Sequence, residues 1–310
     1  MQIWIIIAIF AHFLNAITAI IDKHIVSNKV MKPVVYAFYS GVFQILYLLA
    51  IPVIAIAWPE ISFRFPSWEL FALATFTGAL FILTLTVFFK AIRLGEVSRV
   101  TPVVGVSVPI ATYFLSLFLL GEALGVRQLV AFSLFVIGGF LMSARISRGK
   151  ITHMKGVALA VTAGFLFASY YVLTDFLFDR VGFLDVFMIL QFGGFLGAVI
   201  LLLFPRHRRE IFNMKDEEND IIENKASAAL FIYDKVIAAV AAALLLYAIS
   251  IGNVVIINSL ESTKYVFTLL MAVILSRRLP ALFHEQTGNG VIVQKGIALV
   301  FIAVGLFLIA

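Results

Sequence analysis

Long apolar stretches alternate with short polar ones along all 310 residues of the chain. A helix rises about 1.5 Å per residue, so about 20 apolar residues cross a hydrocarbon core of about 30 Å. Ten stretches approach or exceed this length, at about 2–22, 34–57, 69–90, 98–120, 126–144, 154–175, 183–204, 236–254, 262–283 and 291–310. Strands of a membrane barrel would instead be segments of about 10 residues with alternating polarity. The pattern predicts an all-α integral membrane protein with ten transmembrane helices.

Composition narrows the function classes. Hydrophobic residues make up 63% of the chain and charged residues 13%, against about a quarter charged in soluble domains. Of the 40 charged residues (23 basic and 17 acidic), 13 lie in the segment 206–235, which we interpret as a polar cytoplasmic linker. This composition excludes an ordinary soluble enzyme, a disordered chain and a nucleic-acid binder that relies on the net charge of +6. The absence of cysteine excludes disulfides and cysteine-ligated metals.

Basic residues follow the odd-numbered stretches. Nineteen of the 23 Lys and Arg residues lie after stretches one, three, five, seven and nine, and the other four are Arg64, Arg127, Arg180 and Lys264. The positive-inside rule places basic loops in the cytoplasm. We therefore expect the odd-numbered loops inside and both termini outside, in the cytoplasmic membrane of a bacterium or an archaeon.

The chain contains a weak internal repeat. Residues Ala11, Phe13, Leu14 and Ala16 recur 152 positions later as Ala163, Phe165, Leu166 and Ala168. The same offset relates Gly41 to Gly193. We therefore divide the chain into a first repeat at 1–150, with spans one to five, and a second repeat at 151–310, with spans six to ten. Because each repeat has an odd number of spans, the two must be inverted in the membrane, which is typical of secondary transporters.

The first half also resembles a known repeat unit. Residues 90–100 read KAIRLGEVSRV, and they are followed by Pro109, Leu120-Gly121-Glu122, Gln128 and Gly138-Gly139. Together these residues resemble the core of an EamA domain, the repeat unit of the drug/metabolite transporter superfamily. The resemblance covers the chain as two units, about 2–144 and 154–310, and is specific in the first. It implies a ten-helix carrier of two inverted five-helix EamA-like repeats, with a central cavity, that exports or exchanges small metabolites.

A polar stripe follows one face of stretch nine. At 100° per residue, Glu261, Lys264, Thr268 and Arg278 fall within about 100°. A charge at mid-membrane costs about 2.5–3.5 kcal/mol, so ionisable residues within a span are functional candidates. Cations on this stripe suit substrates that carry carboxylate or phosphate. The alternative is that Glu261 and Lys264 pair at the helix entrance while Arg278 reaches the aqueous interface.

Further candidates lie on other stretches. We predict a substrate cavity lined by His12, Asn15, Arg99, Tyr113, Tyr171, Tyr247, Lys264, Thr268 and Arg278. The candidates for proton coupling are His12, Asp22, Asp175 and Glu261. Among side chains, an unperturbed imidazole titrates near pH 6.5, in the physiological range. The alternative is a structural role, either in hydrogen bonds between helices or as solvated groups near helix ends.

The sequence predicts a transporter rather than an enzyme. It has no phosphate-cradling Gly-Lys-Ser/Thr loop, no histidines at metal-ligand spacing and no Ser-His-Asp context, so we expect no cofactor and no metal. We expect a secondary transporter that moves small polar metabolites such as amino acids outward by alternating access. Its expected partners are the substrate, the lipid bilayer and a candidate coupling proton, with no nucleic acid, and its expected state is a monomer or a homodimer.

Two alternatives stay open at this point. A sugar-phosphate or nucleotide-sugar exchanger belongs to the same class and is motivated by the cations Lys264, Arg277 and Arg278. A non-transporting membrane sensor or assembly subunit belongs to another class and would use the segment 206–235 as its docking surface.

Overall fold

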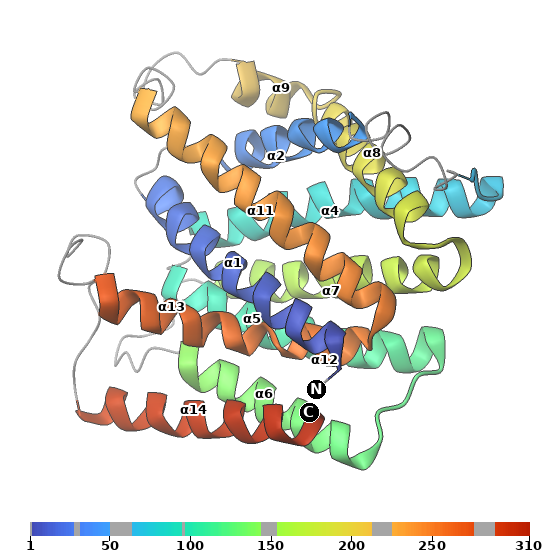
Figure 1. Ribbon diagram of the computed structural model, residues 1–310. Coiled ribbons are helices and arrows are strands. Elements are labelled where there is room, and N and C mark those ends of the chain that lie inside the picture. The colour runs from blue at the N-terminus through green and yellow to red at the C-terminus, as the bar shows by residue number, and fades with distance from the viewer. Residues whose placement is uncertain are drawn as a thin grey trace.

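The computed structural model describes residues 2–27, 32–49, 64–94, 97–143, 154–212, 225–275 and 289–310. Within these ranges every regular element is a helix (Figure 1). The elements are α1 (Ile3–Ser27), α2 (Pro33–Leu48), α4 (Trp68–Leu94), α5 (Val97–Leu115), the π-helix η1 (Ser116–Leu120), α6 (Val126–Ser143), α7 (Met154–Val181), α8 (Phe183–Leu201), α9 (Pro205–Phe212), α11 (Lys225–Ile251), α12 (Val254–Ser259), α13 (Glu261–Leu275) and α14 (Asn289–Ile309).

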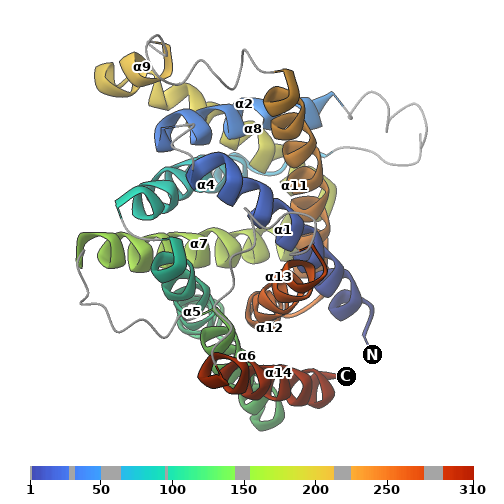
Figure 2. The ribbon, with the colours of Figure 1, turned by 90° about the vertical axis from the view of Figure 1, so that its left-hand side faces the viewer.

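The predicted class of fold is confirmed. Nine helical segments of the described ranges are long and apolar enough to cross a membrane, and α2 is a shorter apolar helix. The chain is therefore an all-α integral membrane protein of about ten spanning helices. Both termini lie beside one another in the two views of the ribbon (Figures 1 and 2), and thus on the same side of the bundle, as expected for an even number of spans.

The ninth span begins earlier than the sequence pattern indicates. Helix α11 ends at Ile251, and the next spanning segment runs over Val254–Ala272 rather than starting near 262. The Asn253 side chain caps this segment, since it accepts hydrogen bonds from the backbone N–H groups of Val255 and Ile256 at 3.1 Å each. A turn at Leu260 then divides the span into α12 and α13.

The packing of the helices follows a regular scheme. Helix α1 packs against α11 and α13, whereas α7 packs against α4 and α5. In the predicted repeat, span one corresponds to span six, span eight to span three and span nine to span four. The contacts of α1 with α11 and α13 therefore correspond to the contacts of α7 with α4 and α5. The division into two inverted repeats stays a prediction, and this correspondence supports it. In both ribbon views α6 and α14 lie together at one edge of the bundle, while α2, α8 and α9 lie at the opposite edge (Figures 1 and 2).

Glycines bring α4 and α8 into backbone contact. A Cβ on Gly78 would lie 2.1 Å from the carbonyl oxygen of Leu190, and a Cβ on Gly193 would lie 2.2 Å from the carbonyl oxygen of Thr75. Neither position has room for a side chain. Small residues permit this close approach of helices in a membrane protein, where van der Waals packing drives helix association.

The two faces of the bundle differ in how they are filled. We call the side where α1, α4, α6, α8 and α13 end the odd-loop face, and the side where α1 begins the even-loop face. The main apolar core includes Ile5 and Ala8 of α1, Leu177 of α7 and Ile249 of α11, all buried. These residues lie in the half near the even-loop face, so apolar packing closes that half.

The segment 206–235 contains more than a linker. Its beginning, up to Phe212, belongs to α9, and its residues from Lys225 onward belong to α11. Residues 213–224 lie outside the described ranges.

A candidate substrate-binding cavity

A cavity of about 350 Å³ lies between α1, α4, α5, α7, α11, α12 and α13. This volume is within the range of about 300–1,000 Å³ typical of small-molecule sites. Its polar lining residues come from five helices and are His12, Asn15, Thr101, Tyr171, Asn258, Glu261, Lys264, Tyr265 and Thr268. Its apolar lining residues are Ala19, Phe88, Phe89, Ile92, Val104, Val108, Phe167 and Leu245.

The cavity lies between mid-membrane and the odd-loop face. On α1 it is lined by positions 12, 15 and 19 of a helix that ends at Ser27, and on α4 by Phe88, Phe89 and Ile92 near the helix end at Leu94. On α5 the lining begins at Thr101, shortly after the helix starts. The odd-loop face carries most basic residues, and its assignment to the cytoplasm stays a prediction from the positive-inside rule.

An ion pair forms the charged centre of the cavity. The Lys264 ammonium contacts the Glu261 carboxylate one helical turn away. The two side chains keep exposures of 18% and 19%, so both remain accessible from the cavity. Because the ninth span runs over Val254–Ala272, the pair lies at its middle and not at a helix entrance. Pairing offsets the cost of two charges at this depth.

His12 faces this centre from α1. Its Nε2 lies 3.1 Å from the carbonyl oxygen of Ile257, to which the ring N–H donates. The other ring nitrogen, Nδ1, is buried, and no described group forms a hydrogen bond with it. The side-chain amide nitrogen of Asn258 is likewise buried without a hydrogen-bond partner in the described chain. The wall thus offers polar atoms that a polar ligand or water can satisfy.

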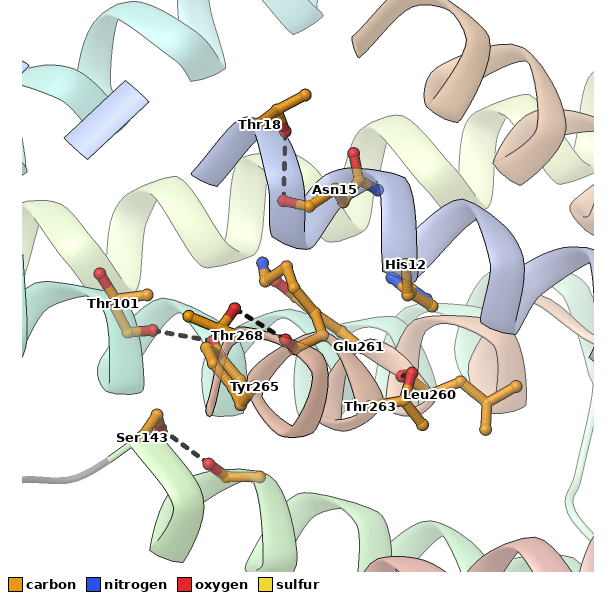
Figure 3. A network of polar contacts seen from close by, with 12 residues as sticks. His12, Asn15, Thr18, Thr101, Ser143, Leu260, Glu261, Thr263, Tyr265 and Thr268 are labelled. Carbon is orange, nitrogen blue, oxygen red and sulfur yellow. Dashed lines mark hydrogen bonds and ion pairs between the residues drawn. The ribbon is translucent and has the colours of Figure 1, made fainter. Parts of the chain in front are cut away.

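Tyr265 joins α13 to α5 at the same level. Its hydroxyl donates to the carbonyl oxygen of Thr101 at 3.3 Å. The hydroxyl rests against Gly105, where a Cβ would lie only 2.2 Å from the hydroxyl oxygen. Figure 3 shows His12 and Asn15 on one side of this space, with Glu261, Tyr265 and Thr268 on the other and Thr101 beside them.

Aromatic rings form the opposite wall. The rings of Phe88 and Phe167 are 5.9 Å apart, and those of Phe167 and Tyr171 are 6.4 Å apart. Phe89 continues this wall and contacts Tyr36 of α2, with the ring centroids 4.3 Å apart. The cavity therefore combines one compact charged centre with a broad apolar surface.

The structure brings six of the predicted site residues together. The cavity is lined by His12, Asn15, Tyr171, Glu261, Lys264 and Thr268. Arg278 and the side chains of Asp22 and Arg99 lie outside the described part of the chain. Whether these residues bind substrate or couple transport stays a prediction.

Three further predicted residues lie away from the cavity. Tyr113 packs against the Phe132 ring with the centroids 5.5 Å apart. Tyr247 is 41% exposed and contacts the ring of Phe183. Asp175 is buried in α7, where its electrostatic neighbours are Glu122 and Asp179 rather than the cavity residues.

Sequence reasoning missed several lining residues. Thr101, Asn258 and Tyr265 are absent from the predicted lining, and Asn258 lies in α12, between the predicted spans eight and nine. The position of Tyr265 directly after Lys264 was an available signal. Uncharged polar residues and phenylalanines are frequent in membrane helices, so residue type alone does not select those that face a cavity.

Spanning helices that enclose a solute-sized cavity with a charged centre define a polytopic membrane protein with an internal cavity. Residues 2–144 match the model of the EamA-like transporter family. The first half of the chain is therefore an EamA-like domain, which confirms the resemblance seen in that half and supports a membrane transporter of the drug/metabolite transporter superfamily.

The fold also matches solved structures. Among 17 matching chains, one described as "Crystal structure of protein" has a TM-score of 0.70 and 17% sequence identity, over 98% of this chain and 96% of that chain. At this identity the likeness shows the fold alone. No curated protein matches the sequence.

Proposed function

We propose that the protein is a secondary transporter that moves small zwitterionic metabolites such as amino acids out of the cell by alternating access. The observation that carries the proposal is the Glu261–Lys264 ion pair at the middle of the ninth span, exposed to the cavity. An α-amino acid carries one ammonium and one carboxylate. These two groups can take the place of each partner of the ion pair, so binding leaves neither protein charge unpaired.

The aromatic wall supports the same substrate class. Phe88, Phe167 and Tyr171 give the cavity an apolar surface beside the charged centre. Binding the side chain of an amino acid there removes apolar area from water, which stabilises the complex. The cavity thus matches a molecule with a zwitterionic end and a mainly apolar body.

The position of the cavity permits loading from the cytoplasm, which outward movement requires. It lies in the half near the odd-loop face, which the basic residues place in the cytoplasm, and the apolar core closes the other half. A substrate therefore enters from the cytoplasm in this state. Rearrangement of the two halves around the site then exposes it to the opposite side.

Counterflow in proteoliposomes tests this proposal. We expect purified protein to take up labelled amino acid when the vesicles are loaded with the unlabelled compound, with saturation. Glu261→Gln and Lys264→Met should each lower the rate at least about tenfold, since each variant leaves one charge of the substrate unpaired. Glu69→Gln is the matched control, because Glu69 is exposed at the start of α4.

A folded wild-type protein without counterflow of any amino acid contradicts the proposal. So does a set of variants at positions 261 and 264 that transport like the Glu69→Gln control.

An anion exchanger has one observation in its favour, the position of Lys264 in the cavity. Among the described lining residues, Lys264 is the only lysine or arginine, and its pairing with Glu261 disfavours a doubly charged phosphate. Counterflow of a sugar phosphate in the same vesicles decides between the two.

A further inference from the structure

The short helix α9 has an unusual surface for a segment that directly follows a spanning helix. It reads Pro-Arg-His-Arg-Arg-Glu-Ile-Phe and begins directly after the three-residue turn 202–204 that ends α8 at the odd-loop face. Ile211 is its one buried residue, and it packs into a cluster with Val34 and Val35 of α2 and Leu201 of α8. This contact holds α9 at the edge of the bundle, beside α2 (Figure 2).

Large apolar side chains around α9 are exposed. Leu203 is 75% exposed, Phe204 54% and Phe212 65%. Exposed apolar side chains next to a membrane span are stabilised where the headgroups meet the acyl chains, at the depth where amphipathic interfacial helices lie.

Three arginines of α9 lie between Phe204 and Phe212 in the sequence. Arg206, Arg208 and Arg209 are all exposed. Arg206 pairs with Glu210 at 3.2 Å. At 100° per residue, Arg208 lies about 40° to one side of Phe212 and Arg209 about 60° to the other. The outer surface of α9 therefore presents an aromatic side chain between two guanidinium groups.

We propose that α9 is a docking site for anionic phospholipid on the odd-loop face, with Arg208 and Arg209 contacting the phosphate and Phe212 inserted at the acyl boundary. The arginines supply charge complementarity to anionic headgroups, and Arg suits phosphate because its planar fork donates two parallel hydrogen bonds. Exposed Phe212 and Leu203 favour a lipid over a soluble phosphate, because they gain stabilisation only where acyl chains are present. The site is separate from the substrate cavity, so the proposal does not depend on which substrate is carried.

Lipid binding to the purified full-length protein tests the proposal. The measurement is the affinity for phosphatidylglycerol, phosphatidylcholine and glycerol phosphate, determined in detergent at low salt. The double variant Arg208→Gln, Arg209→Gln should bind phosphatidylglycerol about 30-fold more weakly, from about fivefold for each arginine removed. Phe212→Ala should also weaken phosphatidylglycerol binding and leave the response to salt unchanged.

The matched control is the double variant Lys90→Gln, Arg93→Gln, which removes two exposed basic residues of α4 near the same face. It should retain phosphatidylglycerol binding within about twofold. If both double variants lose the same affinity for phosphatidylglycerol, the lipid is attracted to basic residues in general, and the proposal is overturned. Glycerol phosphate binding as tightly as phosphatidylglycerol would overturn it too, because the site would then be for a soluble phosphate. Binding of phosphatidylcholine at the same affinity would remove the role of the anionic headgroup.

Discussion

At the scale of single residues, the informative feature is a pair of opposite charges at mid-membrane. Glu261 and Lys264 neutralise one another, and each keeps about a fifth of its side chain exposed. The sequence indicated both residues, because an ionisable group within an apolar stretch needs a functional or structural reason. The sequence did not show how far this pair lies from the start of the helix. The polar residues between Asn258 and Lys264 interrupt the apolar pattern, so the pattern places the start of the span after them.

The rule that selects polar residues within spans works only where the helix rotation is known. It identified His12, Asn15 and Tyr171, which line the cavity, and in the same way Tyr113 and Tyr247, which do not. Two tyrosines at similar depths in their spans face different surroundings when their helices are rotated differently. Rotation depends on the contacts of each helix with its neighbours, which the periodicity of an almost wholly apolar helix does not define.

Gly105 leaves room for the hydroxyl of Tyr265 beside the cavity. A Cβ on Gly105 would lie 2.2 Å from the Tyr265 hydroxyl oxygen, so the ring must move away from α5. Tyr265 lines the cavity, and Gly105→Ala should therefore reduce the space for bulky substrates. We expect the ratio of tryptophan to alanine counterflow to fall about tenfold, the effect of about one methylene in a pocket.

The double variant Gly105→Ala, Tyr265→Phe removes the hydroxyl that meets the new methyl group. This double variant should restore most of the wild-type ratio of tryptophan to alanine counterflow. An unchanged ratio in the single variant, measured on protein that elutes as the wild type does, would contradict a role of Gly105 in selectivity.

At the scale of elements, the number and type of the helices followed from the hydropathy pattern, whereas the division of the ninth span did not. Apolar length alone defines most spans, because each must cross the same hydrocarbon thickness. The break after Gly252 depends on a single side chain, Asn253, that caps α12. An asparagine between two apolar stretches is equally compatible with a loop, so the sequence did not reveal that the next helix starts there.

Asn253 should therefore position the charged centre as well as stabilise the helix. Replacing it by alanine removes both hydrogen bonds to the first turn of α12 and should cost about 1 kcal/mol. This corresponds to a decrease of about 2 °C in the unfolding temperature. We also expect slower counterflow, because Ile257, the hydrogen-bond partner of His12, lies on the uncapped helix.

Asn253→Ser retains a capping side chain and should behave like the wild type in both measurements. If the alanine and serine variants unfold at the same temperature, the cap contributes nothing and this part of the account fails.

At the scale of the whole molecule, the bundle is closed on one side and hollow on the other. The apolar core lies toward the even-loop face and the cavity toward the odd-loop face. The resemblance of the first half to the EamA repeat and the internal offset of 152 residues predicted a central cavity between the halves. They did not predict on which side of the bundle the cavity lies, because the inward-open and outward-open states of a carrier have the same sequence.

Thiol labelling can locate the open side, because the chain has no cysteine of its own. Ala19→Cys places a thiol in the cavity lining, and Ala8→Cys places one in the buried core of the same helix. A membrane-impermeant maleimide added to the cytoplasmic face of inverted vesicles should label position 19 and not position 8. The unsubstituted protein is the control for background labelling. Faster labelling of position 8 from the opposite face would show that the resting state is open outward.

The most direct test of the central claim measures competition for counterflow of labelled phenylalanine by two truncated analogues. Phenethylamine lacks the carboxylate that would contact Lys264, and phenylpropionate lacks the ammonium that would contact Glu261. The account predicts that unlabelled phenylalanine competes at least about tenfold better than either analogue, because each analogue leaves one protein charge without a partner. Equal competition by phenylpropionate and phenylalanine would show that the site recognises only the carboxylate. This result would contradict recognition of a zwitterion by the ion pair.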